Sequence, residues 1–204
     1  MRTVNGRLNA ARFFCIFAYG SDGKRIENIG MKTQGTIDLL TMDLCARIPF
    51  GVRVLHEGWN YEWDQELHTL ERVTGYDGEF FTTKVIDTHN GEEYREDRHS
   101  VEGLGKPFLR RIADMTKEEV NELIDILNKH AGGRTITREN FELTSSGTLW
   151  FTNMKEYECV SEKLMHVVID YLNKHHFDYR GLIPKALAIA VTEEYNPYKI
   201  QTQS

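Results

Sequence analysis

Residues 175–181 hold the chain's densest group of chemically versatile side chains. Two imidazoles, a carboxylate, a phenol and a guanidinium fall within this run, namely His175, His176, Asp178, Tyr179 and Arg180. Adjacent residues on a helix point about 100° apart, so the two histidines do not readily ligate one metal ion. We therefore favour a structural role, in which the histidines complement a helix C-terminus and Gly181 permits a positive φ. The alternatives are a binding corner with Arg180 as an anion anchor and, less favoured, a metal-dependent hydrolase.

A row of aromatic residues is the second candidate site. Trp59, Tyr61 and Trp63 alternate with polar residues, so on a strand they would share one face. Such a row can stack on sugars or unpaired bases, but the carboxylates around it disfavour nucleic acid. Packing beneath a helix is the other interpretation, because large aromatic side chains often fill cores. If the row is exposed, it becomes the leading binding surface.

One compact basic cluster offers possible phosphate contacts: Lys106, Arg110 and Arg111. The whole chain has 25 basic and 31 acidic residues and a net charge of -6, which repels phosphate backbones and anionic lipid. We therefore expect weak nucleic-acid binding at most, and no binding to membranes.

Signatures of catalysis and of cofactor binding are absent from the sequence. There is no complete phosphate-binding loop, no GxSxG elbow and no HExxH helix. The three cysteines, Cys15, Cys45 and Cys159, have no zinc-ligand spacing. We expect no cofactor, no metal ion and no enzymatic activity, although a nucleophile and a base can still meet in three dimensions.

The helices that would position these residues follow from apolar spacing. Residues 37–48 predict a short N-terminal helix that Pro49 ends. Thr116 and Glu119 form a capping box that begins a second helix, with an apolar stripe over residues 120–127. A third amphipathic helix follows Ser161 and runs to the histidine pair. Pro184 fits the first turn of a further short helix in residues 182–191.

Strand and turn signals predict an antiparallel sheet of three to five strands. Two runs, residues 67–73 and 79–86, flank the turn-forming stretch 75–78 and form a hairpin. Residues 50–55 read as another strand, and the charged run 92–99 as an edge strand or a loop. A second hairpin is expected at 141–143 and 148–151. The fold class is therefore α+β, with a small antiparallel sheet, two main amphipathic helices and the short N-terminal helix.

The chain's length favours one domain with a separate N-terminal arm. Its 204 residues, 40% of them hydrophobic, suffice for a single core. We assign residues 1–30 to an arm, 31–198 to one α+β domain and 199–204 to a loose tail. The arm would contain a marginal hairpin, with strands over residues 12–19 and 25–29. Its apolar run, residues 13–19, is at the lower limit of a secretory h-region, so we expect a cytoplasmic protein, with secretion as the alternative.

Three stretches of the sequence carry a resemblance to a known family. They are residues 43–52 (DLCARIPFGV), residues 107–111 followed by 115–119, and residues 172–185 (LNKHHFDYRGLIPK). They are similar to signatures of a family of small uncharacterised proteins encoded by gut Bacteroidales and by their phages and mobile elements. The resemblance spans roughly residues 31–198 and favours Met31 as the ancestral start. It implies a phage or mobile-element context and supplies no mechanism.

The sequence therefore favours a non-enzymatic protein that acts by binding another protein. Its binding face would be the aromatic row or the polar corner at residues 175–180. A weak nucleic-acid-binding regulator is the alternative. The sequence does not identify the partner or the oligomeric state.

Overall fold

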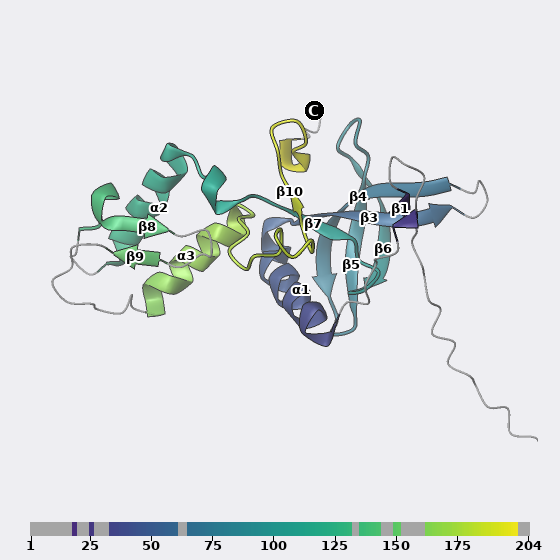
Figure 1. Cartoon of the computed structure of the whole chain (residues 1–204), viewed down its shortest axis with the longest axis horizontal. Helices are drawn as coiled ribbons and strands as arrows, with labels where there is room; N and C mark the ends of the chain where they lie inside the picture. Colours follow the sequence, from purple (N-terminus) through teal and green to yellow (C-terminus); the bar gives the residue numbers. More distant parts are fainter. Residues whose placement is uncertain are drawn as a thin grey trace, which may run out of the picture. The chain divides into compact units, whose positions relative to one another are not determined.

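The computed structural model describes residues 18–19, 25–26, 33–60, 65–131, 135–143, 149–151 and 162–199 (Figure 1). The chain divides into two compact units, residues 1–33 and 34–204. In the first unit, β1 (Ala18–Tyr19) pairs antiparallel with β2 (Arg25–Ile26). These four residues belong to the two strands predicted for the arm.

The second unit is built on a six-stranded sheet with the strand order β10-β7-β3-β4-β5-β6. All neighbours pair antiparallel except β10 and β7, which are parallel. The strands are β3 (Arg53–Asn60), β4 (Gln65–Tyr76), β5 (Phe80–Ile86), β6 (Glu93–Ser100), β7 (Lys106–Leu109) and β10 (Ile189–Ala190). The structure confirms mixed helix and sheet content, but the sheet has one strand more than the predicted maximum. The sequence analysis missed β7 and β10, which are too short to show a periodic pattern.

Helix α1 (Gln34–Arg47) packs on one face of this sheet (Figure 1). Leu40 and Leu44 point into a core that also contains Val54 and Phe81 of the strands. The structure confirms the predicted helix before Pro49, but the helix has 14 residues and is as long as α2, so it is longer than predicted. Its extra turn, beginning at Gln34, carries no apolar signal of its own. A 3-10 turn at Ile48–Phe50 ends the helix where Pro49 predicted an end.

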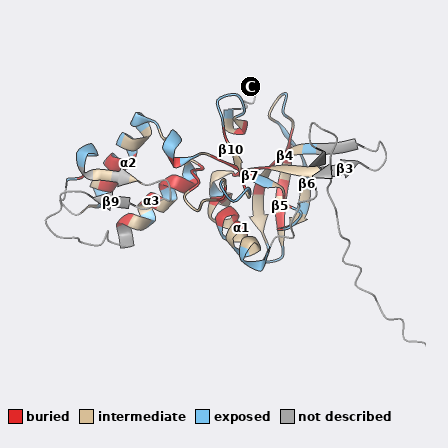
Figure 2. Cartoon of the chain, in the orientation of Figure 1, coloured by how far each residue is buried: buried red, intermediate tan, exposed pale blue. Residues whose placement is uncertain are grey.

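Helices α2 (Lys117–His130) and α3 (Glu162–Lys174) share a second core. The predicted capping box is present, because Thr116 accepts a hydrogen bond from the Glu119 amide and Glu119 accepts one from the Thr116 amide. A hairpin of β8 (Phe141–Leu143) and β9 (Leu149–Phe151) confirms the second predicted hairpin. The buried residues of this core include Leu123, Leu127, Val168 and Leu172 (Figure 2).

The segment after α3 differs from the prediction. No helix forms in residues 182–191; two turns lead instead to β10. Both oxygens of the Asp178 carboxylate accept backbone hydrogen bonds, from the amides of Leu182 and Ile183 at 2.8 Å. Ala186 has a φ of 56°, which is incompatible with a continuous right-handed helix. Local capping by Asp178 and pairing with β7 therefore override the weak helix signal of Pro184.

A close backbone contact fixes the spacing between β3 and the loop before β7. A Cβ atom at Gly105 would lie 1.7 Å from the carbonyl oxygen of Leu55 and 2.7 Å from the Cα atom of His56. Only glycine fits at such a distance.

Among the described residues, no helix combines the length and the apolar character that crossing a bilayer requires. Residues 13–17 of the apolar run 13–19 lie outside the described residues.

Candidate functional site

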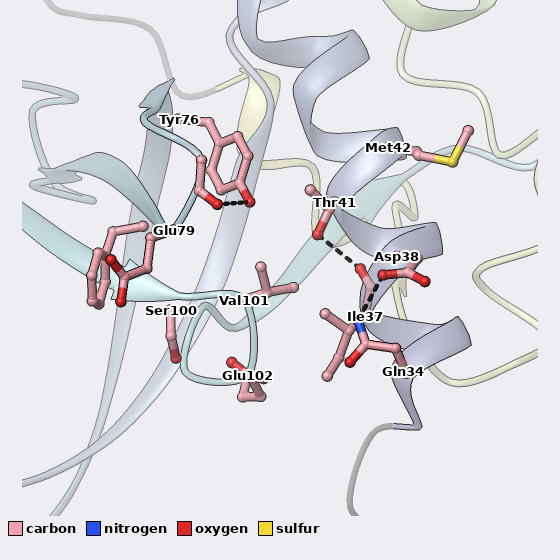
Figure 3. A pocket seen from close by; sticks show the side chains of 12 residues that line it. Gln34, Ile37, Asp38, Thr41, Met42, Tyr76, Glu79, Ser100, Val101 and Glu102 are labelled. Carbon is pink, nitrogen blue, oxygen red and sulfur yellow. Dashed lines mark hydrogen bonds between the residues drawn. The ribbon is translucent and has the colours of Figure 1, made fainter.

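A hollow of about 530 Å³ lies between α1 and the turns at one end of the sheet (Figure 3). We call it the acidic hollow. Its walls come from α1, from the hairpin that joins β4 to β5, and from the turn that joins β6 to β7. The lining residues are Gln34, Ile37, Asp38, Thr41, Met42, Tyr76, Gly78, Glu79, Phe80, Ser100, Val101 and Glu102.

One stripe of α1 forms the first wall. The five lining residues of the helix lie at i, i+3, i+4, i+7 and i+8 from Gln34, which places them on one face. The side-chain amide of Gln34 donates to the Asp38 carboxylate at 2.8 Å, and the Thr41 hydroxyl donates to the Ile37 carbonyl at 2.8 Å (Figure 3). Met42 is 62% exposed, so its apolar side chain is accessible to a ligand. The stripe therefore offers both polar and apolar contacts to a ligand.

The β4–β5 hairpin forms the second wall. Asp77 accepts hydrogen bonds from the amides of Glu79 and Phe80 at 3.0 and 2.8 Å, which fixes the turn. These bonds lower the pKa of Asp77 below its ordinary value. The Tyr76 hydroxyl donates to the Gly78 carbonyl, and Gly78 has a φ of 101°, a conformation that favours glycine. The turn is thus held in one shape at the edge of the hollow.

The charged residues that line the acidic hollow are all acidic. Three carboxylates, those of Asp38, Glu79 and Glu102, are among its lining residues, and no lysine, arginine or histidine lines it. Its hydroxyl groups include Thr41 and Ser100, but no lining imidazole is present to activate them. This arrangement suits the binding of a cationic group and lacks the nucleophile–base pair of a hydrolase.

The structure does not describe the side chains of the predicted aromatic row. Trp59 lies in β3, but its side chain, like all of Tyr61 and Trp63, is outside the described residues. The row therefore stays a prediction.

The predicted basic cluster is partly neutralised. The Arg110 guanidinium donates to both carboxylate oxygens of Glu119, at 2.6 and 2.9 Å. Burial raises the pKa of Glu119, but its hydrogen bonds with Arg110 and Thr116 outweigh this effect and lower it. Arg110 is thus committed to an ion pair that also joins the capping box of α2. Lys106 on β7 and Arg111 before α2 are both exposed.

Within the predicted polar corner, the side chains face different neighbours. The ring of His175 stacks on Tyr171 with centroids 4.3 Å apart, and the ring of His176 stacks on Tyr198 at 4.0 Å. Asp178 caps the following turn, as described above. The two imidazoles and the carboxylate therefore contact different parts of the fold.

Burial shapes the chemistry of His176. Burial, together with the charges of Arg47, Arg53 and Arg110, lowers the pKa of His176 to about 3. The residue is therefore neutral at physiological pH. It also has a φ of 57°, a conformation that non-glycine residues seldom adopt.

Arg180 and Tyr179 join the corner to α1. The Nε atom of Arg180 lies 3.6 Å from the Asp43 carboxylate, which also accepts two hydrogen bonds from Arg47. Arg47 is fully buried and donates in addition to the Phe177 carbonyl at 2.8 Å. The guanidinium groups of both arginines lie near the ring of Tyr179. Arg180 thus takes part in a largely buried ionic network.

A further cluster contains residues that the sequence analysis did not consider. His56 of β3, Glu71 of β4 and His99 of β6 each offer a ligand atom, and these atoms lie within 4.8 Å of one another. We call this set the His-Glu-His cluster. Its members are 15 and 28 residues apart and match no linear motif, so only the register of the strands could have revealed them.

The buried carboxylate of the His-Glu-His cluster is anionic. Burial raises the pKa of Glu71, but hydrogen bonds with His56, His99 and Thr83 outweigh burial and hold the pKa far below its ordinary range. The described ion pairs of Glu71 are with the two histidines.

Comparison of the chain with protein-family models, with curated proteins and with solved structures found no match. The family resemblance suggested by residues 43–52 and 172–185 therefore stays a prediction.

Proposed function

We propose that this protein is a binding module that holds a cationic segment of a partner protein in the acidic hollow. The observation that carries the proposal is the composition of the lining, with three carboxylates, no basic residue and an exposed Met42. Lysine and arginine side chains combine an apolar stem with a charged head. The stem would pack on Met42 and Ile37, and the head would approach Asp38 or Glu79.

Protein binding fits the surroundings of the hollow better than nucleic-acid binding. A phosphate backbone would be repelled by the lining carboxylates and by the net charge of -6. The basic cluster offers little compensation, because Arg110 is already paired with Glu119. The weak nucleic-acid regulator therefore remains the less favoured alternative.

The remaining sequence-based expectations complete the proposal. We place the protein in the cytoplasm and assign it no enzymatic role at the hollow. By the family resemblance, its partner would come from a bacterial host or a phage. The aromatic row of Trp59, Tyr61 and Trp63 would extend the interface if it is exposed.

Binding of a labelled hexalysine peptide tests the hollow directly. We expect fluorescence anisotropy to detect binding at low ionic strength and to detect none with a hexaglutamate peptide. The double variant Asp38→Asn, Glu79→Gln should bind hexalysine about fivefold to tenfold more weakly, since each partly exposed ion pair contributes up to about 1 kcal/mol.

A matched control separates the hollow from general attraction between opposite charges. The double variant Glu118→Gln, Asp125→Asn removes two exposed carboxylates from α2 and changes the net charge equally. It should bind within twofold of the natural chain. Equal weakening in both double variants would show that the hollow has no specific role.

A further inference from the structure

The His-Glu-His cluster shares no residue with the lining of the acidic hollow and extends from β3 to the edge strand β6. The Glu71 side chain is fully buried, whereas the imidazoles of His56 and His99 are 25% and 12% exposed. The carboxylate therefore lies innermost, and the two rings lie between it and solvent.

Strand register brings the cluster together on one face. Residues directly opposite each other in paired strands share a face, and so do residues two apart in one strand. Val54 pairs with Glu71, which places His56 on the side of Glu71. His99 pairs with Phe81, and Phe81 is two residues from Thr83, so His99 and Thr83 lie on the same face. The hydroxyl of Thr83 donates to Glu71, which places His99 on the face of Glu71 as well. Four adjacent strands thus contribute to one polar site.

Each oxygen of the Glu71 carboxylate has one imidazole and one hydroxyl neighbour. Oε1 lies 3.4 Å from Nδ1 of His56 and accepts a hydrogen bond from Thr69 at 2.9 Å. Oε2 lies 2.9 Å from Nε2 of His99 and accepts a hydrogen bond from Thr83 at 2.6 Å. The threonines orient the carboxylate in the way that outer-sphere hydrogen bonds orient metal ligands.

These distances suit a small divalent cation. Zinc–ligand bonds of about 2.0–2.2 Å in a tetrahedral site place neighbouring ligand atoms roughly 3.3–3.5 Å apart. Nδ1 of His56 lies 3.4 Å from Oε1 of Glu71, and Nε2 of His99 lies 2.9 Å from Oε2. A shift of the carboxylate or of the His99 ring would therefore bring both imidazoles and one carboxylate oxygen around a single ion. Two imidazole nitrogens and one carboxylate oxygen form a ligand set that Zn²⁺ uses in proteins.

Among the described residues, no lysine or arginine forms an ion pair with the Glu71 carboxylate. Arg95, a nearby arginine, pairs instead with Asp97, at 2.7 Å. The rings of His56 and His99 lie with centroids 4.3 Å apart, a distance at which two imidazolium ions would repel each other. A metal ion between two neutral rings and the carboxylate avoids this repulsion.

We propose that His56, Glu71 and His99 bind one divalent transition-metal ion, with Zn²⁺ as the best match to the ligand set. Three protein ligands leave a fourth tetrahedral position for water on the solvent side of the imidazoles. Thr69 and Thr83 act as positioning residues that hold the carboxylate.

Titration of the tag-free full chain with Zn²⁺ tests the site. Isothermal titration calorimetry should show one Zn²⁺ per chain, and Mg²⁺ and Ca²⁺, which prefer all-oxygen sites, should give no comparable heat. Co²⁺ should give the visible absorption of a tetrahedral nitrogen–oxygen site. Absence of Zn²⁺ binding, or equal binding of Mg²⁺, would overturn the proposal.

Variants assign the binding to the cluster. Glu71→Gln and His99→Gln should each weaken Zn²⁺ binding at least about 100-fold, the upper end of losses seen even for supporting residues. The control variants His89→Gln and His130→Gln replace exposed histidines outside the cluster and should bind normally. If Glu71→Gln fails to fold, His56→Gln replaces the most exposed ligand and gives the same test. Binding that survives His56→Gln and His99→Gln would show that the cluster is only a structural network.

Discussion

The polar corner at residues 175–180 and the His-Glu-His cluster have the same ingredients, two histidines and a buried carboxylate, but different geometry. In the corner the three residues are neighbours in sequence, and each side chain serves a different part of the fold. In the cluster they are far apart in sequence and converge on one carboxylate. Residues that are close in sequence therefore need not place their side chains at one site, because the backbone conformation decides where each side chain points.

The carboxylates of Asp178 and Glu71 also differ in the hydrogen-bond donors that contact them. Asp178 accepts two backbone amides, which makes it part of the scaffold. The described partners of the Glu71 carboxylate are all side-chain groups, and two of them are themselves possible metal ligands. Backbone donors stay in place when a ligand arrives, whereas imidazoles can exchange a hydrogen bond for a metal bond.

The largest expected effect is the loss of the cap in the corner. Asp178→Ala would leave the amides of Leu182 and Ile183 without their charged acceptor in a buried turn. We expect the free energy of unfolding to fall by about 3–5 kcal/mol, from two hydrogen bonds to a charged group. Urea denaturation measures this change. The control Asp170→Ala, at an exposed position of α3, should change stability by less than about 0.5 kcal/mol.

The second effect is a pH dependence that arises in the corner. The pKa of His176 is lowered from 6.5 to about 3 in the folded chain, so the unfolded chain binds more protons between these values. The free energy of unfolding is therefore not reduced by this histidine above pH 6.5. Below pH 6.5 it decreases by about 1.4 kcal/mol for each pH unit until the pH reaches about 3.

Comparison with His176→Asn isolates this contribution, because asparagine tolerates the positive φ at this position. The variant should be less stable at pH 7, having lost the stacking on Tyr198, but should lose about 2–3 kcal/mol less than the natural chain between pH 6.5 and 4.5. Parallel stability curves for the two proteins would contradict a buried neutral imidazole.

The third effect concerns the support of Glu71. Thr83→Val keeps the side-chain shape and removes the hydroxyl that donates to the carboxylate at 2.6 Å. We expect a loss of about 1–2 kcal/mol in denaturation experiments on the metal-free chain. Thr82→Val, one residue earlier on the opposite face of β5, is the matched control. Similar losses in both variants would mean that β propensity, not the hydrogen bond, is being measured.

The smallest effect is expected at the other histidine of the corner. His175 lies 3.8 and 4.0 Å from the carboxylates of Glu119 and Glu122, which is too far for strong hydrogen bonds. Thermal denaturation of His175→Gln should show a loss below about 1 kcal/mol, mainly from stacking on Tyr171. A larger loss would give this residue a structural role that its distances do not indicate.

Elements with local signals were predictable from the sequence. The capping box of Thr116 and Glu119 predicts the start of α2, and Gly78 predicts the turn between β4 and β5. Elements defined by distant partners were not. Strand β10 exists because Ile189 and Ala190 pair with β7, and no pattern within two residues can show this.

The candidate sites follow the same rule. The stripe of α1 that lines the acidic hollow has helical spacing, and its residues from Ile37 onward fall within the predicted helix. The opposite wall, including Glu79, depends on how the sheet meets that helix. The His-Glu-His cluster depends entirely on register, since a shift of one residue would move His56 or His99 to the other face.

Gly105 constrains the position of β3 although it has no side chain of its own. Its missing side chain lets the loop touch the backbone at Leu55 and His56. Even a methyl group at Gly105 would displace β3 and move the His56 imidazole with it. The orientation of this ring therefore depends on a glycine that lies outside β3.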